Sequence, residues 1–258
     1  MNWNGAVIVI TGASSGIGAL VARYAAERGA YPILAARSMD KLQQVSATIS
    51  APHACIQLDV TDTEHVNQQF KQLLDQHGHI DILVNNAGFG LFETAMELSL
   101  HDYEAMMDVN YMGVVRCTKA VLPAMLERGR GHIVNVASIA GKIGSAKSTA
   151  YSASKHAVLG FTNSLRMEMA GTGVHISAVN PGPIDTPFFD TADPSGQYKR
   201  NLGWFIMPAE KVAKRIIRVM DTQTVEVNMP WLASTGTKLM QLFPRLSSGV
   251  ASKLLNKK

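Results

Sequence analysis

Short apolar runs alternate along the chain with longer amphipathic segments. The apolar runs are nearly continuous, which is typical of strands covered on both faces. We expect strands at 6–10, 31–36, 54–59, 80–85, 132–137, 174–180 and 225–229. Between them, apolar residues recur at helical spacing, which predicts helices near 17–28, 39–49, 62–77, 99–126, 151–170 and 208–220. The alternation indicates successive βαβ units.

These units predict an α/β fold of one particular kind. Right-handed crossovers would build a doubly wound, seven-stranded, mainly parallel sheet with helices on both faces. With 258 residues, 47% of them hydrophobic, we expect a single domain over 1–258. The longest segment without clear period is 183–207. A long loop in a compact domain is usually functional or disordered, so we expect 183–210 to be a substrate lid.

Composition narrows the compartment and the partners. The two cysteines, Cys55 and Cys117, form neither a secreted disulfide framework nor a metal cluster, which favours a reducing cytoplasm. The N-terminus leads almost directly into a strand, so we expect no leader peptide, and no apolar run is long enough to span a bilayer. The eight histidines show no ligand spacing, so we expect no metal.

The net charge of +4 is concentrated in a tail. No acid follows Glu226, while five basic residues do: Lys238, Arg245, Lys253, Lys257 and Lys258. Because this basicity is local and no nucleic-acid-binding signature accompanies it, nucleic acid is not an expected partner.

The same segment, 231–258, reads as a basic amphipathic C-terminal extension. Its apolar residues lie near helical spacing, although Pro244 and Gly249 interrupt a continuous helix. The stripe consists of Leu239, Phe243, Leu246, Val250 and Leu254. It packs on its own body or a partner subunit, which we favour, or it contacts an anionic membrane surface.

The stretch TGASSGIG (11–18) follows the first expected strand and opens a helix. Gly12 allows a tight turn, Gly16 lets the backbone approach a pyrophosphate, and Gly18 lets helix and strand pack closely. The helix N-terminus offers free N–H groups and partial positive charge to the phosphates. An ordinary glycine-rich turn is the alternative, but the flanking strand and helix favour a dinucleotide site.

The end of the second strand bears on the choice of dinucleotide. An NAD site would place a carboxylate there, whereas this chain has Ala36 and Arg37. A guanidinium can pair with a 2′-phosphate, and Ser14 or Ser38 can add a hydroxyl. The sequence therefore favours NADP(H), the alternative being that Arg37 is a solvated surface charge.

The pentapeptide YSASK places Tyr151 and Lys155 one helical turn apart, where both can act on a common point. Taken alone, such a pair could equally cover surface. Together with the other motifs, however, the chain over about 6–230 resembles a short-chain dehydrogenase/reductase of the compact type. The matching pieces are TGASSGIG, Asp59, NNAG (85–88), Asn110, Ser138, YSASK and PGPIDT (181–186).

The resemblance implies a Rossmann-type fold, reaction of alcohols or carbonyls with NAD(P)(H), and a catalytic set of Asn110, Ser138, Tyr151 and Lys155. Tyr151 would be the general acid/base, its phenolate favoured by the Lys155 charge. Ser138 would hydrogen-bond the substrate oxygen or simply cap a turn. Asn110 would anchor a water in a proton relay or be a buried structural amide. Implied cofactor contacts are Gly12, Ser14, Ser15, Gly16, Ile17, Gly18, Arg37, Ser38, Asp59, Val60, Asn86, Ala87, Gly88, Tyr151, Lys155, Pro181, Gly182, Ile184 and Thr186.

The lid and its surroundings are rich in apolar side chains, about half of which we expect to be core. They are Phe89, Leu91, Phe92, Phe188, Phe189, Trp204, Phe205 and Met207. An apolar pocket favours a hydrophobic ketone, aldehyde or alcohol as substrate. The helices near 99–126 and 151–170 resemble those through which the family forms dimers and tetramers. A catalytically idle NADP-binding sensor or scaffold is the rival function.

Overall fold

The computed structural model describes residues 2–194, 196, 200, 203 and 206–230. The predicted C-terminal extension, 231–258, lies outside the described residues, as do Trp204 and Phe205 of the predicted lid.

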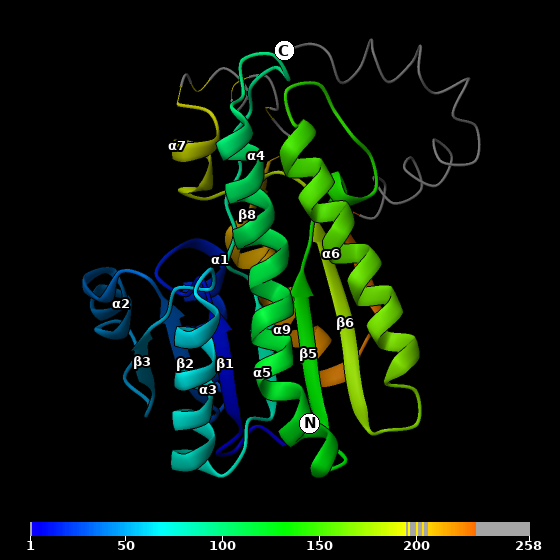
Figure 1. Cartoon of the computed structure of the whole chain (residues 1–258). Coiled ribbons are helices and arrows are strands. Elements are labelled where there is room, and N and C mark those ends of the chain that lie inside the picture. The colour runs from blue at the N-terminus through cyan, green and yellow to red at the C-terminus, as the bar shows by residue number, and fades with distance from the viewer. Residues whose placement is uncertain (1, 195, 197–199, 201–202, 204–205, 231–258) are drawn as a thin grey trace.

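One parallel sheet of seven strands runs through the described chain in the order β3-β2-β1-β4-β5-β6-β9 (Figure 1). The strands are β1 (Val7–Thr11), β2 (Tyr31–Ala36), β3 (Ala54–Gln57), β4 (Ile82–Asn85), β5 (Gly131–Val136), β6 (Val174–Pro181) and β9 (Glu226–Met229). The chain adds β2 and β3 on one side of β1 and then crosses over to add β4 on its other side. The strand order therefore reverses between β1 and β4, which pair with one another. In such sheets ligands bind beyond the carboxyl ends at this switch point.

Helices cover both faces of the sheet, with α3, α5 and α6 in front of it in Figure 1. The helices are α1 (Gly16–Glu27), α2 (Met39–Ser46), α3 (Thr63–His77), α4 (Leu100–Met107), α5 (Gly113–Glu127), α6 (Thr149–Glu168), α7 (Phe188–Ala192) and α9 (Ala209–Thr222). Local chemistry sets several ends. The Asp62 carboxylate accepts from His65 N–H at the start of α3, and Gly78 closes that helix with φ of 73°.

Successive side chains of the central strand β1 point alternately into two layers of the core. Val7 and Val9 face the layer that contains Phe70 of α3 and parts of α5 and α6. Ile8 and Ile10 face the opposite layer, which contains α1 and α9. Because successive strand side chains point to opposite faces, continuous apolar runs fill both layers. The predicted doubly wound sheet is therefore confirmed.

The structure differs from the prediction in two segments. The helix expected over 99–126 is interrupted by a π-helical turn, Asp108–Met112, before α5 begins at Gly113. A Cβ on Gly113 would lie 2.8 Å from a Val60 methyl carbon, so the chain resumes its α-helix where backbone and side chain approach closely. The expected aperiodic segment 183–207 contains α7 and a small parallel pair, β7 (Ile184–Asp185) and β8 (Met207–Pro208).

We predict that Phe70→Ala lowers the free energy of unfolding by about 3–5 kcal/mol, because Phe70 is fully buried between sheet and helices and its removal leaves a cavity. Urea denaturation measures the change. Met96→Ala, at a side chain that is 94% exposed in the segment before α4, is the control and should change stability little. Similar losses in the two variants would contradict this layer arrangement.

Candidate active site

The glycine loop between β1 and α1 depends on the absence of side chains. Gly12 and Gly16 have φ of 66° and 54°, in the left-handed region that favours glycine. A Cβ on Gly12 would lie 2.8 Å from Ala87 Cα, and one on Gly18 would lie 2.5 Å from Gly12 O. The loop therefore packs directly on the segment after β4. A Cβ on Gly16 would meet Thr186 at 3.4 Å, so the glycine loop also approaches the PGPIDT segment after β6.

The N-terminus of α1 has the properties of an anion site. Ser15 is the exposed N-cap residue, and its side chain makes no capping hydrogen bond. The first turn contains no acid, so nothing there offsets the positive end of the helix dipole. Ser14 and Ile17 beside it are half-buried. A loop that is closed to side chains and open at its N–H groups fits the pyrophosphate of a dinucleotide.

Hydrogen bonds from two side chains, Asn86 and Thr11, join this loop to the NNAG segment. The Asn86 side-chain amide donates to Thr11 O at 3.0 Å and to Gly12 O at 3.2 Å. In return, the Thr11 hydroxyl oxygen accepts from the N–H groups of Asn86 and Ala87, both at 3.0 Å. Asn86, implied by the resemblance as a cofactor contact, therefore also braces the glycine loop. Thr11 was not singled out from the sequence, although its place at the head of the glycine motif was a usable signal.

The end of β2 presents Arg37 at the surface, where its carbonyl accepts from the Gln57 amide at 3.0 Å. Ser38 caps α2 by accepting from Lys41 N–H at 3.4 Å. Arg37 is therefore an exposed residue directly after β2, whose carboxyl end lies at the same edge of the parallel sheet as the glycine loop.

Asp59 follows β3 near this edge. Burial alone would raise the pKa of its carboxyl, but two hydrogen bonds from Thr61 and the Arg37 charge outweigh burial and hold the pKa below its usual value. Asp59 is therefore ionised at neutral pH. Its neighbour Val60 is buried against Gly113.

Tyr151 and Lys155 lie together on α6, and Lys155 is only 6% exposed. Lys155 Nζ donates to Val136 O at 3.0 Å and lies 5.8 Å from the centroid of the Tyr151 ring. Burial lowers the pKa of Lys155 to about 8. A Cβ on Gly88 would lie 3.5 Å from Nζ, so the ammonium is adjacent to the NNAG segment. Tyr151 and Lys155 therefore lie beside Gly90 and Gly88, at the carboxyl end of β4.

Asn110 occupies the π-helical turn and is fully buried. Its Oδ1 accepts from Phe89 N–H at 2.9 Å, and its amide donates to Phe89 O at 2.8 Å and Ser154 Oγ at 3.0 Å. Ser154 in turn donates to Tyr151 O at 2.8 Å. The side chain of Asn110 thus ties the NNAG segment to α6. Ser154, inside the YSASK motif, is a further residue that the sequence did not single out.

Ser138 follows β5 and is buried at the carboxyl edge of the sheet. Its hydroxyl donates to Pro181 O at 3.2 Å and accepts from Ala140 N–H at 3.0 Å, so it does cap the short turn after β5. A hydrogen bond to a substrate oxygen requires this hydroxyl to rotate away from Pro181. Gly182 continues the edge by donating to Met229 O at 2.7 Å, and Ile184 beyond it is buried.

Aromatic rings surround Tyr151. The rings of Phe92 and Phe188 lie 5.8 and 5.6 Å from it, centroid to centroid. A Cβ on Gly90 would lie 2.9 Å from Phe188 and 3.0 Å from Tyr151, so Gly90 permits this packing. Among the described apolar candidates, Phe189 and Met207 are buried core, while four are half-buried: Phe89, Leu91, Phe92 and Phe188.

Comparison with known proteins identifies the class. The family model for short chain dehydrogenases matches residues 6–195, and the chain belongs to this family. An uncharacterized oxidoreductase of Staphylococcus epidermidis is 33% identical over 223 residues, covering 86% of this chain and 94% of that protein. The fold and these relatives define an oxidoreductase of the short-chain dehydrogenase type.

Two solved structures share the fold and hold different dinucleotides. A serine dehydrogenase complexed with NADP+ is 31% identical with a TM-score of 0.81, covering 86% of this chain and 94% of that one. A short-chain dehydrogenase/reductase from Burkholderia phymatum in complex with NAD is 26% identical with a TM-score of 0.88, covering 96% of both chains.

The described residues offer neither a metal site nor a membrane-spanning helix. Within them, no three His, Cys, Asp or Glu side chains gather closely enough to hold a metal ion. None of the helices in the same part of the chain has the length and apolar character needed to cross a membrane.

The buried ammonium of Lys155 predicts how stability varies with pH. Above pH 8 the folded chain has released this proton, while the unfolded chain keeps it up to its ordinary pKa of 10.5. Lys155 should therefore add up to about 3 kcal/mol to the free energy of unfolding of the cofactor-free protein between pH 8 and 10.5 and add nothing below pH 8. Burial raises the pKa of the Cys117 thiol from 9.0 to about 12, which opposes this rise above pH 9, so the contribution of Lys155 is measured by comparing variants.

Urea denaturation across this pH range tests the prediction. Lys155→Met should remove the rise, whereas Lys119→Met, at an exposed lysine of α5, should keep it. The same pH dependence in both variants would show that the Lys155 ammonium is not desolvated.

Proposed function

We propose that the protein is an NADP(H)-dependent oxidoreductase that interconverts a hydrophobic ketone or aldehyde and its alcohol. The observation that carries the proposal is the position of Tyr151. Its phenol lies on α6 beside the buried Lys155 and among the rings of Phe92 and Phe188. A proton-transfer group with a cation on one side and apolar walls on the other suits this chemistry.

The residues that would hold NADP(H) line the cleft at the switch point. The N–H groups of the glycine loop would bind the pyrophosphate, and Arg37 with Ser14 or Ser38 would bind the 2′-phosphate. Asp59 and Val60 would contact adenine. Lys155 and Thr186 would hold the nicotinamide end. When bound, the cofactor supplies the hydride or accepts it.

Tyr151 would donate the proton to the carbonyl oxygen and remove it in the reverse direction. A free phenol has a pKa of about 10, which makes it a poor base at neutral pH. Because the pKa of Lys155 is about 8, its ammonium is mostly charged at pH 7. That charge near the ring stabilises the phenolate and brings the phenol toward its working range.

Ser138 and Asn110 would support this step in different ways. After rotation from Pro181 O, the Ser138 hydroxyl would donate to the substrate oxygen as negative charge develops there. Both hydrogens of the Asn110 side-chain amide are already donated, one to Phe89 O and one to Ser154 Oγ. Any relay water at Asn110 would therefore be held through an acceptor oxygen rather than through the amide N–H groups.

The surroundings support an apolar substrate and a homo-oligomer. Within the segment 183–210, which we propose as the substrate cover, Phe188 of α7 already contacts Tyr151. Apolar side chains are exposed on α5 and α6, where covering by a second copy would be favourable: Leu126 and Met167. We place this enzyme in the cytoplasm, in keeping with its two free cysteines.

We predict that Tyr151→Phe keeps NADPH binding and loses turnover by at least about a hundredfold, since one general acid/base typically contributes this much. NADPH oxidation with a panel of apolar carbonyls gives the rate, and cofactor fluorescence gives binding. Tyr103→Phe, on α4, is the matched control. Near-normal turnover in Tyr151→Phe would refute the assignment. Tight NADPH binding with no turnover of any carbonyl by the unaltered protein would instead indicate a sensor.

We predict that Arg37→Asp shifts cofactor preference from NADPH toward NADH by at least about tenfold in kcat/KM ratio. A carboxylate repels the 2′-phosphate and can accept from the ribose hydroxyls. Steady-state kinetics with both cofactors measures the ratio. Arg218→Asp, at an exposed arginine of α9, controls for net charge. An unchanged ratio in Arg37→Asp would show that Arg37 does not select the cofactor.

A further inference from the structure

A cavity opens at the amino ends of the strands, on the edge of the sheet opposite the candidate active site. Its volume is about 490 Å³, within the range of small-molecule sites. Ala6, Ile82 and Gly131 line it at or beside the starts of β1, β4 and β5, whereas the glycine loop and Tyr151 lie beyond the other ends of these strands. The proposed oxidoreductase chemistry makes no use of this cavity.

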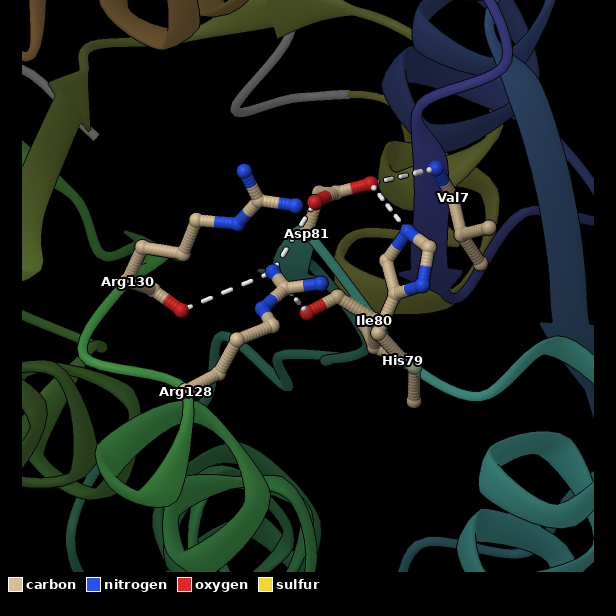
Figure 2. A network of polar contacts seen from close by, with 6 residues as sticks. All are labelled: Val7, His79, Ile80, Asp81, Arg128 and Arg130. Carbon is tan, nitrogen blue, oxygen red and sulfur yellow. Dashed lines mark hydrogen bonds and ion pairs between the residues drawn. The ribbon is translucent and has the colours of Figure 1, made fainter.

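A polar network forms one wall of the cavity (Figure 2). Asp81 Oδ1 pairs with Arg128 Nη2 at 2.9 Å. Asp81 Oδ2 accepts from Val7 N–H at 2.9 Å and lies 3.2 Å from His79 Nε2. Both carboxylate oxygens are therefore engaged, and Asp81 works as an anchor for Arg128 rather than as a free negative charge.

The guanidinium of Arg128 is only partly used by this network. Its Nη2 donates to Asp81, to Ile80 O at 3.4 Å and to Arg130 O at 3.5 Å. Its Nε and Nη1 are buried, yet neither has a partner among the described residues. A buried donor without a partner destabilises the fold, more so when it is charged, unless a ligand or water satisfies it.

His132 lines the same cavity and also has a buried nitrogen without a hydrogen-bond partner among the described residues. His132 is 4% exposed, and its Nε2 is hydrogen-bonded to Ser177 Oγ at 2.8 Å. Its Nδ1 is buried and has no partner in the described part of the chain. Burial, aided by His175, lowers the pKa of His132 to about 3, so the ring is neutral. When Nε2 accepts from the Ser177 hydroxyl, Nδ1 carries the hydrogen and can donate.

The charge around these groups is positive. Arg128 and Arg130 extend from the segment after α5 toward Asp81 (Figure 2), which gives two guanidinium groups against one engaged carboxylate. His79 and His175 also line the cavity. Guanidinium groups bind oxyanions through strong, charge-assisted hydrogen bonds.

We propose that this cavity binds a small metabolite through an oxyanion group, a phosphate or a carboxylate, held by Arg128, Arg130 and His132. The volume exceeds that of one inorganic phosphate, so the rest of the ligand would fill the remaining space between the strand ends. The site is separate from the dinucleotide cleft and does not depend on the proposed function.

Isothermal titration tests the proposal with protein saturated by whichever dinucleotide it binds, NADPH or NADH, which fills the phosphate-binding loop of the other site. Inorganic phosphate and citrate are the two probes, each titrated at constant ionic strength against sodium chloride. We expect one saturable site, and the stronger probe tells phosphate from carboxylate ligands. If phosphate and citrate gave no more binding heat than sodium chloride at the same ionic strength, the proposal would be overturned.

Three variants locate the binding. Arg130→Gln, at an exposed side chain, should weaken binding about fivefold, and Arg128→Lys, which keeps the charge but loses the guanidinium donors, by more than about tenfold. Lys211→Gln, at an exposed lysine of α9, should bind as the unaltered protein does. Circular dichroism checks folding. Equal affinity of Arg130→Gln and Lys211→Gln would overturn the assignment even if Arg128→Lys failed to fold.

Discussion

The hydroxyl of Thr11 links the two strands between which the sheet reverses its order. It accepts from two successive N–H groups after β4, while Asn86 returns two hydrogen bonds to the backbone after β1. The two chain segments are thereby held so close that Gly12 and Gly18 have no room for a side chain. The opening of the cleft, the N-terminus of α1 and the NNAG segment all take their positions from this junction.

The burial of Lys155 is the electrostatic counterpart of that junction. Placing an ammonium in the interior is costly, and the protein satisfies it with a carbonyl from the end of β5. The same strand leads into Ser138, and the same helix carries Tyr151. One strand end and one helix therefore set the distances among a cation, a phenol and a hydroxyl, and rigid elements hold such groups better than loops do.

Much of this architecture could be predicted from the sequence. Continuous apolar runs marked every strand of the sheet, and the glycine and YSASK motifs marked the cleft, because these signals are local. Contacts between distant segments left no such signal. The pairing of Ser154 with Asn110, and of Arg128 with Asp81 across 47 residues, depends on how helices and strand starts meet. The hydrogen bond from the Ser138 hydroxyl to Pro181 O arises in the same way, and spacing alone does not reveal it.

The π-helical turn at Asp108–Met112 holds Asn110, which supports the candidate active site, whereas α5 beyond it packs on the sheet. A π turn accommodates one extra residue while the flanking α-helices keep their relative phase. Loss of a single residue there would leave the buried face of α5, with Cys117 and Val121, against the sheet. It would carry Asn110 away from Phe89. The chain can therefore vary the support of its cleft at this turn by insertion or deletion without repacking its core.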